Sequence, residues 1–161
     1  MRNRSVRLIA CGALVSAGSL AVALPGGMAS AKVVKASCTA ETGNGTTETL
    51  SGCTDSADTG GGGTATSVQV TGTTSVSGTE TIHWTSGKTT VITFTGALKG
   101  GKADKCTPPA GHANVYEVKS KGTVTGGTAS ALQGGKFSAT VCAYNGSGLL
   151  VVNFPGKPIK L

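Results

Sequence analysis

The strongest constraint on the fold is the alternation of short apolar runs with glycine-rich punctuation after the first thirty residues. None of these runs places apolar residues at helical spacing over three turns. Valine and threonine are frequent in them, and such β-branched residues favour strands. The expected strands are residues 32–37, 46–51, 64–71, 79–85, 89–98, 115–125, 136–144 and 149–154. Short strands at this spacing predict an all-β fold, a small antiparallel sandwich or barrel of about seven or eight strands.

Two segments carry the clearest hairpin pattern. In residues 79–98, apolar and polar residues alternate on both sides of a Ser-Gly turn. Alternation buries one face of a strand, so we expect Trp84 and Phe94 to share the core. In residues 137–154, the Asn-Gly pair at 145–146 is typical of a tight hairpin turn, and the Ser-Gly pair that follows would lengthen the loop.

The two hairpins resemble each other at an offset of about sixty residues, as do the segments 62–66 and 126–130. A duplicated unit would explain the resemblance, and so would chance in a chain rich in threonine and glycine. Both explanations stay open for residues 32–161, which we expect to form one domain.

Residues 1–31 have the three parts of a secretory signal peptide. Three arginines precede an uncharged run at 8–24, and Ala29-Ser30-Ala31 offers small residues at the cleavage positions. The run is shorter and less apolar than the roughly 20 residues that span a bilayer. Cys11 stands near its beginning, whereas a lipidated cysteine closes such a run. We therefore expect cleavage before Lys32, and a secreted protein, extracellular or associated with the cell envelope, with no transmembrane segment after cleavage.

Removal of the signal leaves eleven lysines against seven acidic residues, a net charge of +4, and no arginine. Arginine makes the bidentate contacts on which readout of phosphate and guanine depends. The sequence therefore predicts no nucleic-acid partner, whereas an envelope or protein partner remains open.

Four cysteines remain after cleavage, namely Cys38, Cys53, Cys106 and Cys142. An even number in an exported domain predicts disulfides, and four cysteines allow three pairings. We favour the pairs close in sequence, Cys38–Cys53 and Cys106–Cys142, each flanking what looks like one supersecondary unit. A metal site is not expected, because no C-x-x-C pair is present and neither histidine has a companion at ligand spacing. We expect no other cofactor.

Candidate catalytic residues do not form a recognisable set. No serine stands in a G-x-S-x-G turn, and His83 falls on the solvent face of its predicted strand. The carboxylates Glu41, Glu48, Glu80 and Glu117 are spread along the chain, so their spacing predicts no acid/base pair. We therefore expect no catalytic residue, and a protein that acts by binding or as a structural element.

The longest segment without strand character is 99–114. It contains Lys102 and Lys105, a cysteine, and the stiff pair Pro108 and Pro109. Proline orders the backbone in advance, which lowers the entropy lost on binding. These four residues form a possible contact loop, and the alternative is an exposed connector.

The segments 50–54, 59–64, 82–90 and 122–127 resemble small secreted proteins of actinobacteria, mycobacteria included. The resemblance covers most of the mature chain and implies location and fold. In general format the chain is also similar to two secreted actinobacterial families. The subtilisin-inhibitor family presents its reactive loop just after a cysteine, where residues 106–110 stand here. The neocarzinostatin-like proteins are two-disulfide sandwiches that carry a small molecule. These similarities imply two alternative functions, a protease inhibitor and a small-molecule carrier.

Overall fold

The computed structural model describes residues 35–100 and 105–161 of the chain. Helical structure in them is limited to α1 (Ser56–Thr59) and the 3-10 helix η1 (Ser130–Leu132). The strands are β1 (Ser37–Gly43), β2 (Thr47–Cys53), β3 (Gly62–Thr71), β4 (Ser75–Trp84), β5 (Thr89–Gly100), β6 (His112–Gly127), β7 (Lys136–Gly146), β8 (Leu150–Asn153) and β9 (Ile159–Lys160). The predicted signal peptide lies outside the described residues.

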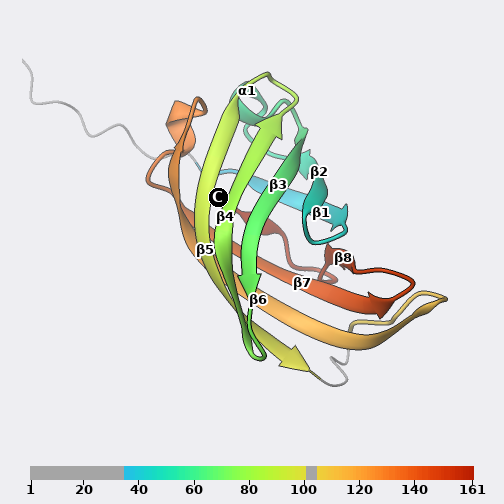
Figure 1. Cartoon of the computed structure of the whole chain (residues 1–161). Helices are drawn as coiled ribbons and strands as arrows, with labels where there is room; N and C mark the ends of the chain where they lie inside the picture. Colours follow the sequence, from blue (N-terminus) through green and yellow to red (C-terminus); the bar gives the residue numbers. More distant parts are fainter. Residues whose placement is uncertain (1–34, 101–104) are drawn as a thin grey trace, which may run out of the picture. The chain divides into compact units, whose positions relative to one another are not determined.

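The strands form a closed antiparallel barrel (Figure 1). From β1 to β8 each strand pairs with the next, and β8 returns to pair with β1, placing Thr42 opposite Val152. The short β9 pairs with both β1 and β7 beyond the end of β8. The expectation of an all-β fold is confirmed, and the pairing of β8 with β1 decides for a barrel over a sandwich.

Seven of the expected strands are confirmed with shifted ends, and the short one expected near 32–37 overlaps β1 only at Ser37, while residues 32–34 lie outside the described residues. Lys35 and Ala36 precede the first strand, which runs through Ser37–Gly43 instead. The alternation of apolar and polar residues did not predict this strand, because Glu41 occupies an inward position where an apolar residue is expected. The hairpin at 137–154 is also confirmed, with the longer loop, because Tyr144 pairs with Leu150.

The packed core fills the barrel near one end, and Trp84 and Phe94 both belong to it, as expected. Its most deeply buried apolar side chains are Ile82, Ile92, Leu132 and Ile159. We call this the closed end, because α1, η1 and the segment 154–161 lie there. At the opposite end, which we call the open end, are the hairpin loops 44–46, 72–74 and 147–149.

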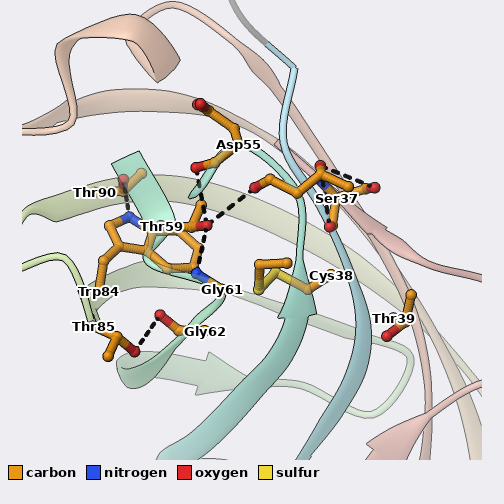
Figure 2. Close-up of a disulfide and its surroundings, with 12 residues drawn as sticks. Ser37, Cys38, Thr39, Asp55, Thr59, Gly61, Gly62, Trp84, Thr85 and Thr90 are labelled. Carbon is orange, nitrogen blue, oxygen red and sulfur yellow. Dashed lines mark hydrogen bonds between the residues drawn. A yellow bond between two sulfur atoms is a disulfide. The ribbon is translucent and has the colours of Figure 1, made fainter. Parts of the chain in front are cut away.

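Hydrogen bonds between polar groups stabilise the closed end of the barrel (Figure 2). The Thr59 hydroxyl donates to the backbone oxygens of Thr54 and Asp55 and accepts from the amide of Gly61. The indole Nε1 of Trp84 donates to Thr90 Oγ1 at 2.7 Å, and both side chains are buried. The turn between β4 and β5 is tied to α1 by an ion pair between Lys88 and Asp58.

Replacing Thr90 with valine is expected to destabilise the protein by about 1–3 kcal/mol, because the buried indole N–H of Trp84 loses its acceptor. Urea unfolding followed by tryptophan fluorescence measures this change. The matched control is Thr93→Val on the exposed face of the same strand, expected to stay within about 0.5 kcal/mol of the wild type. Equal effects of the two substitutions would contradict the role of Thr90 as the hydrogen-bond acceptor of the Trp84 indole.

Both expected disulfides are present, and they lie in different parts of the barrel. Cys38–Cys53 joins β1 to β2 at the closed end (Figure 2). Cys106–Cys142 joins the β5–β6 connection to β7. This second bridge belongs to a separate cluster with Tyr144 and Phe154, distinct from the barrel core.

Candidate ligand-binding site in the barrel

A cavity of about 490 Å³ lies in the barrel, and its lining reaches the loops of the open end at Gly45, Thr73 and Leu149. An eight-stranded barrel has an interior that is either filled by side chains or holds one small ligand. Pockets for small molecules typically measure about 300–1,000 Å³. The cavity therefore has the size of a small-molecule site.

One wall of the cavity is apolar and comes from β5 to β8. Its larger side chains are Phe94, Leu98, Tyr116, Val118, Phe137, Val141 and Val151. The rings of Phe94 and Phe137 meet edge to face, with centroids 6.3 Å apart. Both rings also belong to the packed core, so the apolar wall of the cavity is continuous with that core.

Small residues on the inner face lie beside the apolar wall of the cavity. Phe94 lies opposite Gly78 on one side and Gly122 on the other, so each ring neighbour lacks a side chain. A Cβ on Gly122 would clash with the backbone oxygen of Thr93. Ala139 and Ala143 of β7 also line the cavity, in positions where a larger side chain would enter it.

The opposite wall is polar and carries three carboxyl groups. Glu41 comes from β1, Glu48 from β2 and Glu80 from β4, and Ser67 and Gln69 of β3 lie between them in strand order. Glu48 and Glu80 are only 5% and 9% exposed. The spacing of these carboxylates along the sequence indicated no pair, and closure of the barrel brings the strands of Glu41, Glu48 and Glu80 around one space.

The carboxyl groups are poorly satisfied by the protein itself. Glu41 Oε2 and Glu48 Oε2 are shielded from solvent and have no hydrogen-bond partner among the described residues. Glu117, the fourth carboxylate considered from sequence, is paired with Lys119 at 3.0 Å and does not line the cavity.

Burial raises the pKa of all three cavity carboxyls, and repulsion by neighbouring carboxylates adds to it at Glu41 and Glu80. Burial is the largest cause in each case. The pKa of Glu41 rises to about 8, with further contributions from the charges of Glu80 and Glu48. The pKa of Glu80 rises to about 7, and Glu48 adds to it. The pKa of Glu48 is also raised, although its hydrogen bond with Ser67 acts in the opposite direction. The site therefore favours neutral carboxyls when nothing compensates their charge.

The sequence did contain a signal for two of these residues. Glu48 stands two positions before the buried Leu50, and Glu80 stands two positions before Ile82 and four before Trp84. Side chains two apart in a strand point to the same face. Glu48 and Glu80 thus point to the same face as the core residues. This pattern is overlooked when charged side chains are assumed to face solvent.

Other residues considered from sequence lie away from the cavity. His83 is exposed on β4, as expected, and His112 begins β6. Both flanking strands extend into the predicted contact loop, since β5 ends at Gly100 and β6 begins at His112. Within it, Lys105, Pro108 and Pro109 are exposed, and Lys102 lies outside the described residues. Its role as a contact surface or connector stays a prediction.

Among residues 35–100 and 105–161, no three His, Cys, Asp or Glu side chains are arranged to hold a metal ion. Within the same ranges, no helix has the length and apolar character needed to cross a membrane. Comparison of the chain with models of known protein families, with characterised proteins and with solved structures finds no significant match.

Proposed function

We propose that the protein binds and carries a small, largely apolar molecule in the barrel cavity, as a secreted or envelope-associated protein. The observation that carries the proposal is the cavity of about 490 Å³, with an apolar wall and a lining that reaches the open end. Two disulfides fit an oxidising compartment, which agrees with the signal peptide expected from sequence.

The electrostatics of the cavity favour binding over catalysis. Carboxyl pairs that cleave glycosidic bonds need one group protonated as acid and the other ionised as base or nucleophile. Here burial raises the pKa of Glu41, Glu48 and Glu80, and no lysine or histidine among the described lining residues holds one of them in the ionised form. A binding role uses the same groups as hydrogen-bonding partners and needs no such division.

Ala139→Trp is expected to weaken binding of the neutral fluorescent probe N-phenyl-1-naphthylamine at least tenfold, because the indole would occupy the space beside the phenylalanine pair. Fluorescence titration of the wild type and the variant measures the dissociation constants, and thermal melting verifies that the variant is folded. Val70→Trp is the matched control, since Val70 is 76% exposed and lies outside the cavity lining. Equal loss in both variants, or no saturable binding by the wild type, would contradict the proposed function.

The alternative of a secreted protease inhibitor rests on the segment after Cys106. Residues 107–110 are exposed, and the disulfide to Cys142 anchors the segment at one side. Stoichiometric inhibition assays against secreted serine proteases distinguish this alternative from a carrier.

A further inference from the structure

We propose that the molecule bound in the cavity carries a protonated amine, which sits against Glu41, Glu48 and Glu80 while its apolar part packs on the phenylalanine wall. This inference rests on the proposed function, because it assigns a chemical class to the ligand of the same cavity.

The first argument is the hydrogen-bonding state of the acidic wall. Glu48 is 95% buried, lines the cavity and leaves Oε2 without a partner among the described residues, as does Glu41 at its own Oε2. Buried polar atoms in proteins nearly always have partners, and an unsatisfied one is costly. The groups that would satisfy these acceptors are N–H or O–H donors on a ligand.

The second argument is charge. The described residues that line the cavity include three carboxyls and no lysine or histidine. An ammonium within a few ångströms favours ionised carboxyls and pairs with them, whereas no described lining residue offers a positive charge to a carboxylate ligand. The wall therefore offers a cation opposite charges that it does not offer an anion such as a fatty acid.

The third argument separates an organic cation from a metal ion. No three acidic, histidine or cysteine side chains in the described ranges are arranged to hold a metal. Facing the carboxyls, moreover, lie aromatic and aliphatic side chains that offer a metal nothing but give an alkyl or aryl group a place to pack. An ammonium group with an apolar body fits both walls at once.

Binding of such a ligand must also move protons. The titratable groups lining the cavity are Glu41 on β1, Glu48 on β2, Glu80 on β4 and Tyr116 on β6. With a pKa of about 8, Glu41 is largely protonated at pH 7 in the free protein. An ammonium beside it favours the ionised form, so a proton is released to the buffer when the ligand binds.

Three ligands with the same tail and different heads test the inference: n-octylamine, n-octanol and n-octanoate. Titration calorimetry of the wild-type protein at pH 7 is expected to show octylamine binding at least tenfold more tightly than octanol, with octanoate weakest. Repeating the octylamine titration in buffers of different ionisation enthalpy is expected to reveal net proton release.

The variant Glu41→Gln/Glu48→Gln/Glu80→Gln is expected to lose the preference for octylamine and the proton release, while keeping its affinity for octanol within about threefold. Glu117→Gln, which removes a carboxylate outside the cavity, is the matched control and should retain both. Should the triple variant fail to fold, Glu48→Gln alone is expected to reduce the octylamine-to-octanol ratio at least threefold.

Octanol binding as tightly as octylamine in the wild-type protein would overturn the amine assignment and leave the proposed carrier function intact. An unchanged preference in the folded triple variant would overturn it too. Failure of all three ligands and of N-phenyl-1-naphthylamine to bind would instead remove the proposed function itself, so the two failures are distinguishable.

Discussion

Raising the pH from 4.5 to 8.5 is expected to lower the free energy of unfolding of the ligand-free protein by about 4 kcal/mol or more. The pKa of Glu41 is about 8 in the folded protein against 4.5 for the ordinary side chain, and that of Glu80 is about 7. Each pKa unit corresponds to about 1.4 kcal/mol. A carboxyl whose pKa is higher in the folded than in the unfolded protein stabilises the folded state while it is protonated. This contribution to the free energy of unfolding is fully present below the pKa of the unfolded protein and is lost as the pH rises through the pKa of the folded protein.

Urea unfolding at pH 4.5, 6.5 and 8.5 measures the effect. The variant with glutamine at all three cavity positions cannot ionise there and is expected to show a nearly flat stability between these values. Glu117→Gln should behave as the wild type, because its carboxylate lies outside the cavity and is paired with Lys119. A wild-type protein that is equally stable at pH 4.5 and 8.5 would contradict the raised pKa values and the burial that causes them.

The same linkage ties the stability to the proposed ligand. An ammonium in the cavity compensates ionised carboxyls, so it stabilises the folded protein most where the free protein is weakest. Octylamine should therefore raise the melting temperature more at pH 8.5 than at pH 4.5. A neutral ligand such as octanol interacts with no charge and should stabilise the protein comparably at both values.

The class of the fold was accessible from sequence because local patterns encode strands. Alternation around Trp84 and Phe94 identified a buried face correctly, and glycines marked the turns near Gly60, Gly87 and Gly134. The disulfide pairs were found because each joins neighbouring parts of the chain. The closure of the sheet into a barrel could not be predicted from the sequence. The pairing of Thr42 with Val152 joins residues that are 110 positions apart, and no local pattern indicates it.

The candidate site was missed for a related reason. Glu41, Glu48 and Glu80 are separated along the chain and meet only because the sheet closes. Two of them lie in phase with core residues, but sequence reasoning assigns charged side chains to solvent, since burying a charge is costly. Such a departure from the local rule is expected where a protein builds a functional site. The phase of Glu80 with Ile82 and Trp84 was thus the clearest sequence signal for the candidate site.

Removing the disulfides is the second change for which we expect a large effect, and the two bridges should differ. In the loop-entropy model the cost grows with the length of chain that the bridge closes. Cys38–Cys53 spans 15 residues and Cys106–Cys142 spans 36. We therefore expect Cys38→Ala/Cys53→Ala to lower the free energy of unfolding by about 3 kcal/mol, and Cys106→Ala/Cys142→Ala by about 4 kcal/mol.

Ligand binding should separate this loss of stability from a loss of function. Cys106 and Cys142 pack with Tyr144 and Phe154 in the cluster apart from the barrel core, and none of the four lines the cavity. The folded fraction of Cys106→Ala/Cys142→Ala should therefore bind N-phenyl-1-naphthylamine with wild-type affinity, measured well below its melting temperature. Urea unfolding of both variants measures the loss of stability, and titration with the probe measures the affinity of the cavity. Unchanged stability would refute the structural role of the bridge, and a tenfold loss of affinity in folded protein would show that the β5–β6 connection shapes the cavity.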